Sequence, residues 1–195
     1  EWPMKPTFPI RGKTIAIVGL GRIGRSMAVR CIALGMKVIA VEQYPDNDFI
    51  AKHGIELVDV DGMVEQSDVI SIHCPLMDET RHMFNKDIFS RMKKGSILIN
   101  TARGPIVKEV DLLDALNDGP LMAAGLDVFE VEPVTADNPL FQLKNVVCSP
   151  HIGGGDTKSQ EDMGIEAADS IIKLYQGEWP DLAIINKDVR EGWSW

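Results

Sequence analysis

The chain has 195 residues, of which 45% are hydrophobic, and a formal net charge of −9 at pH 7. That hydrophobic content is ordinary for a globular protein with a sizeable core. The negative charge argues against nucleic acid or an anionic membrane surface as the main partner, and no stretch is long and apolar enough to predict a membrane span.

The three cysteines, Cys31, Cys74 and Cys148, are odd in number and widely separated. Their spacing is not that of metal ligands, so we expect no metal site. Each lies among apolar residues, which favours buried, reduced thiols and therefore a cytoplasmic location.

The first 60 residues predict an extended arm followed by a βαβ unit. Residues 1–11 contain three prolines and are expected to be extended. Thr14–Val18 is a β-branched run that predicts a strand, and Lys37–Val41 predicts the next one. Between them, apolar residues at helical spacing predict a helix that ends at Gly35. Its expected buried face consists of Ile23, Met27, Cys31 and Leu34.

Apolar strands and amphipathic helices continue to alternate along the rest of the chain. We expect strands at Val69–Ile72, Ser96–Asn100, Ala123–Leu126 and Val146–Cys148, and helices at Val60–Gln66, Lys86–Met92, Lys108–Asn117 and Thr157–Tyr175. In the last helix, Thr157 and Gln160 have capping-box spacing, and the predicted apolar face is Met163, Ala167, Ile171 and Leu174. This alternation predicts an α/β fold with a doubly wound, mostly parallel sheet.

A glycine motif, Gly19-Leu20-Gly21-Arg22-Ile23-Gly24, follows the first strand and opens the first helix. This context is the one in which G-x-G-x-x-G indicates a Rossmann-type dinucleotide-binding domain. Gly19 permits the tight turn, Gly21 lets the backbone approach a pyrophosphate, and Gly24 lets the helix pack closely on the sheet. Glu42, at the end of the second strand, can accept hydrogen bonds from ribose hydroxyls and would repel a 2′-phosphate. The predicted cofactor is therefore NAD rather than NADP.

Several segments together resemble the D-isomer-specific 2-hydroxyacid dehydrogenase family. They are Gly19–Gly24, His73-Cys74-Pro75-Leu76 with Thr80, Asn100-Thr101-Ala102-Arg103-Gly104, Gly125-Leu126-Asp127-Val128-Phe129-Glu130-Val131-Glu132-Pro133 and Ser149-Pro150-His151-Ile152-Gly153-Gly154. The resemblance extends over nearly the whole chain, from Gly12 to about Asn186, and covers the cofactor domain of the family.

The resemblance implies three catalytic residues: Arg103 as the substrate arginine, His151 as the acid/base and Glu132 as its partner. The chemistry agrees, because a planar guanidinium can hold the carboxylate of a 2-oxo acid. A histidine can exchange a proton with the carbonyl oxygen as hydride is transferred. A carboxylate bonded to the ring orients it and favours its protonated form. Glu130 remains an alternative to Glu132.

The resemblance also implies the cofactor contacts. Arg22 and Ile23 are expected at the pyrophosphate, Cys74, Pro75 and Thr80 on the adenosine side, and Thr101, Ala102 and Asp127 near the nicotinamide; Arg103, His151, Gly153 and Gly154 complete the expected set. The other histidines, His53, His73 and His82, are interpreted as structural.

We expect residues 12–176 to form the dinucleotide-binding domain and residues 177–195 to return toward a substrate domain that is largely absent. Trp2, Trp179, Trp193 and Trp195 cluster near the ends, which either fold back or pack on something absent. The predicted function is hydride transfer between NAD and a small D-2-hydroxy or 2-oxo acid of the phosphoglycerate, glycerate or glyoxylate type. This chain alone is expected to be inactive, and the family resemblance implies a homodimer. A non-catalytic NAD(H)-binding sensor or scaffold module is the alternative.

Overall fold

The computed structural model describes residues 8–193, so most of the predicted N-terminal arm, including Trp2, lies outside the described residues, as does Trp195. The chain divides into two compact units, Glu1–Pro150 and His151–Trp195. The domain limits expected from the sequence, 1–11, 12–176 and 177–195, do not follow this division and stay a prediction.

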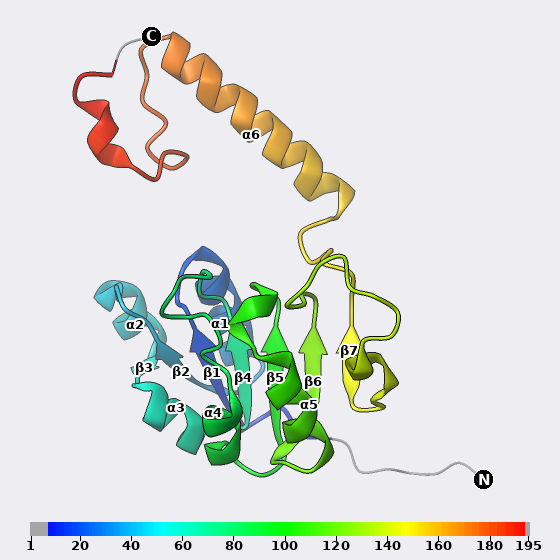
Figure 1. Cartoon of the computed structure of the whole chain (residues 1–195). Helices are drawn as coiled ribbons and strands as arrows, with labels where there is room; N and C mark the ends of the chain where they lie inside the picture. Colours follow the sequence, from blue (N-terminus) through cyan, green and yellow to red (C-terminus); the bar gives the residue numbers. More distant parts are fainter. Residues whose placement is uncertain (1–7, 194–195) are drawn as a thin grey trace. The chain divides into compact units, whose positions relative to one another are not determined.

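The first unit is built on a seven-stranded sheet in the order β3-β2-β1-β4-β5-β6-β7, and every neighbouring pair is parallel (Figure 1). The strands are β1 (Thr14–Val18), β2 (Lys37–Val41), β3 (Glu56–Leu57), β4 (Val69–Ile72), β5 (Ser96–Asn100), β6 (Leu121–Leu126) and β7 (Val146–Cys148). The expected doubly wound α/β fold is confirmed.

Five α-helices connect these strands: α1 (Arg22–Ala33), α2 (Asn47–His53), α3 (Val60–Gln66), α4 (Lys86–Arg91) and α5 (Glu109–Asn117). Two short 3-10 helices lie at Gly104–Ile106 and Pro139–Gln142. In Figure 1, α3, α4 and α5 lie in front of the sheet and α1 lies behind it. Helices on both faces explain why β1 and β4 consist almost wholly of buried apolar residues.

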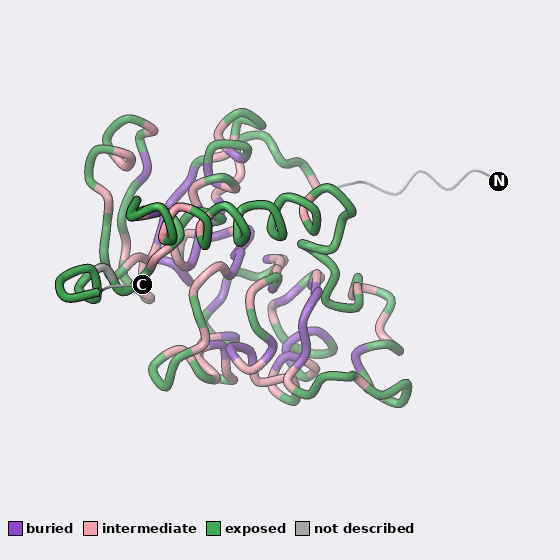
Figure 2. Tube along the Cα trace, turned by 90° about the horizontal axis from the view of Figure 1, so that it is seen from above, coloured by how far each residue is buried: buried purple, intermediate pink, exposed green. Residues whose placement is uncertain are grey.

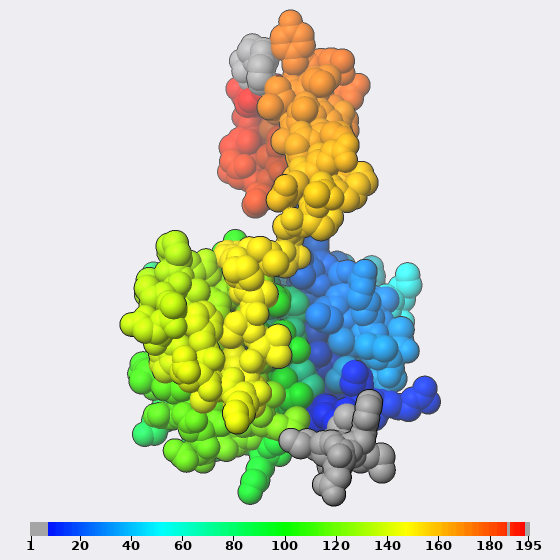
Figure 3. Space-filling view, turned by 90° about the vertical axis from the view of Figure 1, so that its right-hand side faces the viewer, coloured from blue at the N-terminus to red at the C-terminus, as the bar shows by residue number. Residues whose placement is uncertain are grey.

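Burial on the two faces of the sheet differs between its two halves. β1, β2 and β4 are buried on both faces. Figure 2 shows that the buried segments lie inside the trace and are surrounded by exposed ones. On the β5–β6–β7 side, Leu98 and Leu126 are buried, whereas Ile97 and Ile99 are only half-buried and Val147 is 76% exposed. Figure 3 shows green atoms at the surface between the yellow and the blue parts of the chain. One sheet face is therefore only partly covered within residues 8–150.

The predicted buried face of α1 is confirmed at Cys31 and is wrong at its two ends. Ile23 is 72% exposed and Leu34 is 56% exposed, and the buried positions are Gly24, Ala28 and Cys31. The helix lies close to β1, since a Cβ on Gly24 would lie 3.1 Å from Ile17 Cγ2. The larger apolar residues at its two ends are therefore turned outward.

The second unit begins at His151 and contains α6 (Thr157–Tyr175) and a 3-10 helix at Lys187–Arg190. The cap of α6 is Asp156 rather than Thr157, because its carboxylate accepts a hydrogen bond from the Ser159 N–H at 3.0 Å. No residue within α6 is buried. Of its predicted apolar face, Met163, Ala167 and Ile171 are exposed and Leu174 is half-buried.

Two of the four tryptophans pack against each other within this second unit. The rings of Trp179 and Trp193 are edge to face with centroids 5.9 Å apart, and the Arg190 guanidinium lies 5.8 Å from the Trp179 centroid. Among residues 8–193, no helix is long and apolar enough to cross a membrane.

Candidate functional site

The sheet has a switch point between β1 and β4. From β1 the chain moves outward through β2 to β3, and it then returns to β4 and continues outward to β7. At such a point the connections leave in opposite directions, and a crevice opens outside the carboxyl ends of the strands, where ligands bind in open parallel sheets. The glycine turn follows β1, Glu42 follows β2 and Cys74 follows β4, so all three lie at this edge.

The turn after β1 requires two of its glycines for space. Gly19 has a φ of +94°, and a Cβ on it would lie 2.5 Å from the backbone nitrogen of Cys74. A Cβ on Gly24 would lie 2.1 Å from the carbonyl oxygen of Gly19. A Cβ on Gly21, in contrast, meets nothing within 4 Å. Gly21 therefore leaves an open backbone surface, as close approach of a pyrophosphate requires.

Helix α1 begins at this open surface. Its N-cap is Gly21, no side chain caps it, and its first turn contains no acidic residue. The first N–H groups of an α-helix have no acceptor within the helix, and its dipole end is positive. The start of α1 thus has the properties of a phosphate-binding helix terminus, and it contains the predicted contacts Arg22 and Ile23.

Glu42 connects the end of β2 to the glycine turn. Its Oε2 accepts a hydrogen bond from the Leu20 N–H at 2.5 Å, and its Oε1 accepts one from the Tyr44 N–H at 2.9 Å. A carboxylate offers about four acceptor sites, so these two bonds orient it and leave capacity for ribose hydroxyls. The neighbouring Arg25 is held by Asp46, with Nη1 and Oδ2 2.7 Å apart.

A pocket of about 250 Å³ joins these residues to the loop after β4. Its lining includes the predicted residues Gly19, Glu42, Cys74, Pro75 and Thr80. This volume suits part of a dinucleotide, since pockets for whole drug-sized ligands have about 300–1,000 Å³. Burial, and secondarily the charge of Glu42, raises the pKa of the Cys74 thiol, so Cys74 contributes a neutral wall. Thr80 also closes its own loop, since its Oγ1 donates to the Pro75 carbonyl at 2.7 Å.

The loop carrying Arg103 is closed by Asn100, which ends β5. The buried Asn100 amide donates to the Arg103 carbonyl oxygen at 3.0 Å and accepts from the Ala102 N–H at 3.1 Å. The guanidinium of Arg103 is exposed, and its Nη1 donates to the Ala102 carbonyl at 2.6 Å. Thr101 is exposed in the same loop. The sequence places Asn100 in a motif without a role of its own, and the structure shows that it holds the loop in shape.

The segment leading to Glu132 packs directly on this loop. A Cβ on Gly104 would lie 1.8 Å from the Phe129 carbonyl oxygen, so only glycine permits this approach. Three residues further on, the exposed Glu132 accepts a hydrogen bond from the Phe129 N–H at 2.9 Å. The structure thus brings the Arg103 loop and the Glu132 turn together through Gly104 and Phe129.

Glu130, the alternative to Glu132, is part of a separate network. Its Oε1 lies 2.6 Å from His82 Nε2, and its Oε2 accepts from the Glu109 N–H at 2.7 Å. Glu130 and His82 therefore connect three segments of the chain, which suits a structural role. His73 is similarly engaged, with Nε2 2.9 Å from the buried Ser71 Oγ, and burial lowers the pKa of its ring.

Asp127 lies at the carboxyl end of β6 and is only 5% exposed. Its N–H donates to the Asn100 carbonyl at 3.0 Å, and its Oδ1 accepts from Ser149 Oγ at 2.5 Å. Asp127 is therefore next to the base of the Arg103 loop. His151, Gly153 and Gly154 belong to the second unit. His151 is exposed with a φ of +55°, and the functional roles of all three stay predictions.

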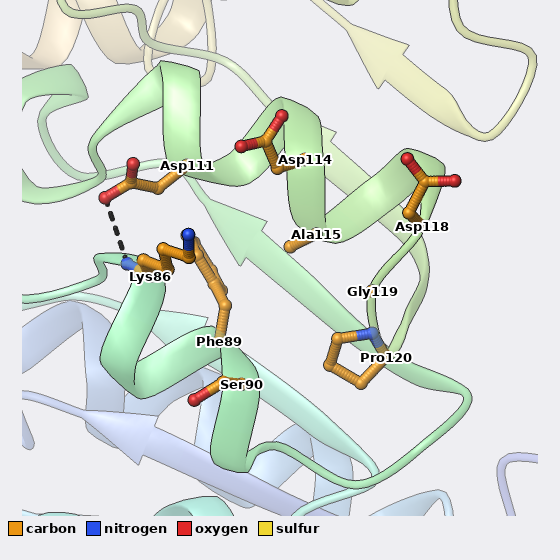
Figure 4. A pocket seen from close by; sticks show the side chains of 9 residues that line it. All are labelled: Lys86, Phe89, Ser90, Asp111, Asp114, Ala115, Asp118, Gly119 and Pro120. Atoms are coloured by element: carbon orange, nitrogen blue, oxygen red, sulfur yellow. Dashed lines mark hydrogen bonds between the residues drawn. The ribbon is translucent and has the colours of Figure 1, made fainter.

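A larger pocket, of about 420 Å³, lies between α4 and α5 (Figure 4). Its walls include Asp111, Asp114 and Asp118, and Asp111 accepts a hydrogen bond from the Lys86 N–H at 2.9 Å. Asp118 precedes β6, so this pocket reaches the amino edge of the sheet. None of the predicted site residues lines it. Despite its greater volume, this pocket is therefore not the candidate site.

The switch-point crevice fits a dinucleotide on the geometry of this chain alone. The open backbone at Gly21, the uncapped start of α1 and the oriented carboxylate of Glu42 supply contacts for pyrophosphate and ribose. The fold and this crevice define the class of NAD-binding α/β domains.

Comparisons with known proteins specify the family. The NAD-binding domain of the D-isomer specific 2-hydroxyacid dehydrogenases matches residues 1–153. The chain is 42% identical over 179 residues to a D-3-phosphoglycerate dehydrogenase of Archaeoglobus fulgidus, covering 91% of this chain and 34% of that protein. It is 38% identical over 182 residues to a glyoxylate reductase of Korarchaeum cryptofilum, covering 93% and 54%.

Solved structures agree with this assignment. D-lactate dehydrogenase with NAD⁺ from Lactobacillus jensenii superposes with a TM-score of 0.81 at 31% identity, covering 89% of this chain and 56% of that chain. The chain belongs to the D-isomer specific 2-hydroxyacid dehydrogenase family and comprises its NAD-binding domain. It spans about half or less of the length of the relatives described here.

Proposed function

We propose that this chain is the NAD-binding domain of an enzyme that transfers a hydride between NAD and a small D-2-hydroxy or 2-oxo acid. The observation that carries the proposal is the loop closed by Asn100. It holds an exposed Arg103 at the carboxyl end of β5, on the same sheet edge as the pocket containing Glu42. A module that only sensed NAD would have no need of a cation fixed at this place.

In this proposal each polar group has a distinct task. NAD, when bound, supplies the hydride chemistry. Arg103 binds the substrate carboxylate in a planar, bidentate manner, for which a guanidinium is better suited than an ammonium group. His151 gives a proton to the carbonyl oxygen during reduction and removes it during oxidation. Glu132 orients the His151 ring.

The substrate belongs to the phosphoglycerate, glycerate or glyoxylate type. The names of the relatives, which include D-3-phosphoglycerate dehydrogenase, glyoxylate reductase and hydroxypyruvate reductase, support this range. Such substrates share a carboxylate next to a carbonyl or hydroxyl carbon, which is the group that Arg103 suits. The 195-residue chain on its own is expected to bind NADH without turnover, because it spans 54% of the related glyoxylate reductase and 34% of the related D-3-phosphoglycerate dehydrogenase.

We further propose that the protein forms a homodimer through this domain and acts in the cytoplasm. The partly covered sheet face from β5 to β7 offers apolar surface near Val147 for association. The free thiols Cys31, Cys74 and Cys148 suit a reducing compartment. A monomer in analytical ultracentrifugation at high concentration would count against the dimer.

Replacement of Arg103 in the full-length protein tests the proposed function. Arg103→Gln should lower kcat/KM for 2-oxo acids by at least about a thousandfold, since a carboxylate contact to the reacting molecule is lost. The affinity for NADH should change less than about threefold. Arg91→Gln, at an exposed arginine of α4, is the matched control. Normal turnover in the Arg103 variant would reject the assigned role.

The alternative is a non-catalytic NAD(H)-binding sensor or scaffold. It requires that the full-length protein bind NADH and reduce none of a broad panel of 2-oxo acids. That result, obtained with protein shown to bind NADH, would favour the alternative.

A further inference from the structure

Ser149 makes a contact that none of the predicted roles uses. It follows β7 directly, and its N–H donates to the Leu126 carbonyl at 2.9 Å, which fixes its backbone to the end of β6. Its Oγ lies 2.5 Å from Asp127 Oδ1. This separation lies in the range of a hydroxyl donating to a carboxylate, about 2.5–2.7 Å.

The position of Asp127 is fixed on its other side as well. Its N–H donates to the Asn100 carbonyl at 3.0 Å, and the amide side chain of Asn100 closes the Arg103 loop. The backbone of Asp127 is thus held from β5 and its carboxylate from β7. Asp127 is only 5% exposed. Its carboxylate is therefore oriented by hydrogen bonds from the protein rather than by water.

We propose that Ser149 is a positioning residue, which orients the Asp127 carboxylate so that it accepts a hydrogen bond from the carboxamide of the nicotinamide. The inference rests on the proposed function, because it takes the expected nicotinamide contact of Asp127 as its starting point. A hydroxyl uses one of the roughly four acceptor sites of a carboxylate. The bond to Ser149 therefore fixes the direction of the carboxylate through its Oδ1 atom.

Loss of the Ser149 hydroxyl should affect binding at the nicotinamide end of the cofactor only. Gly21 and Glu42 lie at the ends of β1 and β2, whereas Asp127 and Ser149 lie at the ends of β6 and β7. Loss of the Ser149 hydroxyl should therefore weaken ligands that carry nicotinamide. ADP-ribose, which lacks nicotinamide, should bind as before.

The test is calorimetric titration of the 195-residue chain with NADH and with ADP-ribose. The unaltered chain should bind NADH more tightly than ADP-ribose. Ser149→Ala should weaken NADH about tenfold, the effect of one charge-assisted hydrogen bond, and ADP-ribose less than about twofold. Ser149→Thr, which keeps the hydroxyl, should restore most of the NADH affinity. Ser90→Ala, at an exposed serine of α4, is the matched control.

A double-mutant cycle separates positioning from a general structural effect. In an Asp127→Asn background, Ser149→Ala should have almost no further effect on NADH, because the two residues act through one contact. Additive losses would overturn the inference, as would equal losses for NADH and ADP-ribose or no loss for either.

Titration of the unaltered chain distinguishes failure of the Ser149 role from failure of the proposed cofactor site. If it binds NADH no more tightly than ADP-ribose, the role of Ser149 is rejected and the dinucleotide site stands. If it binds neither ligand, both the role of Ser149 and the proposed cofactor site are rejected.

Discussion

The carboxylate of Glu42 accepts a hydrogen bond from the backbone N–H of Leu20 at 2.5 Å, which couples the end of β2 to the middle of the glycine turn. The residue expected to recognise ribose is therefore also a support for the loop expected to bind the pyrophosphate. Changes at Glu42 should affect both cofactor preference and the stability of the turn.

Glu42→Gln should weaken NADH binding about tenfold and lower the free energy of unfolding by about 1 kcal/mol. The glutamine amide has only one acceptor oxygen for the two N–H groups of Leu20 and Tyr44. Discrimination against NADPH should fall, because the negative charge that repels a 2′-phosphate is removed. Fluorescence titration with both nucleotides measures the ratio. Glu56→Gln, an exposed residue of β3, should leave it unchanged, and an unaltered ratio in Glu42→Gln would contradict the role.

Gly21→Ser should strongly weaken cofactor binding without loss of stability. A Cβ at this position meets no atom of the chain within 4 Å, and serine is a good N-cap residue for α1. The added side chain would instead occupy the space expected for the pyrophosphate. Thermal unfolding should show an equal or slightly higher Tm, and NADH affinity should fall by at least about thirtyfold. A variant that binds NADH normally would show that the pyrophosphate lies elsewhere.

Asn100→Ala should loosen the Arg103 loop. It removes two hydrogen bonds of a buried side chain and leaves the Ala102 N–H and the Arg103 carbonyl without these partners. We expect a loss of about 2–3 kcal/mol in urea denaturation. In the full-length protein kcat should fall more than NADH affinity. Asn117→Ala, at the exposed end of α5, is the control and should change stability by less than about 0.5 kcal/mol.

The pH dependence of stability should include a contribution from Asp68. Burial alone would raise the pKa of this carboxyl, but hydrogen bonds from Lys93 and the Thr14 N–H, with the charges of Lys93 and Lys13, outweigh it and lower the pKa. Because the pKa is lower in the folded state, this stabilisation is complete above the usual aspartate value of about 3.9. It is lost as the pH falls through the folded-state pKa.

Asp68→Asn should therefore destabilise the chain by about 2 kcal/mol at pH 7, and the difference from the unaltered chain should shrink below about pH 4. Urea denaturation at several pH values measures this. The exposed Asp118→Asn is the matched control. A difference that stays constant down to pH 2 would contradict the assignment.

Much of the sheet could be predicted from sequence because its strands are short apolar runs between glycines and helices. β1, β2, β4, β5 and β7 have the predicted limits, while β6 begins two residues earlier than expected. The two-residue strand β3 was missed, since Glu56 and Leu57 are exposed at the sheet edge and have no burial pattern. Helix α2 was also missed, and it likewise contains no buried residue.

The error in α1 has a physical cause. Periodicity identifies apolar residues but not how closely a helix approaches the sheet. In α1, close approach selects Gly24 and Ala28, and Ile23 is turned outward. The grouping of Gly19, Glu42 and Cys74 around one pocket could be predicted, because chain order places them after neighbouring parallel strands. The pair of Asp127 and Ser149 could not, because it depends on the side-chain geometry of two neighbouring strand ends.

The central claim is that the switch-point crevice binds NAD through the glycine turn and Glu42. Its most direct test is calorimetric titration of the 195-residue chain with NADH and, separately, with NADPH. We predict saturable binding of one NADH per chain, with NADPH at least about thirtyfold weaker because its 2′-phosphate meets Glu42. No binding of NADH, or equal affinity for the two nucleotides, would contradict this account.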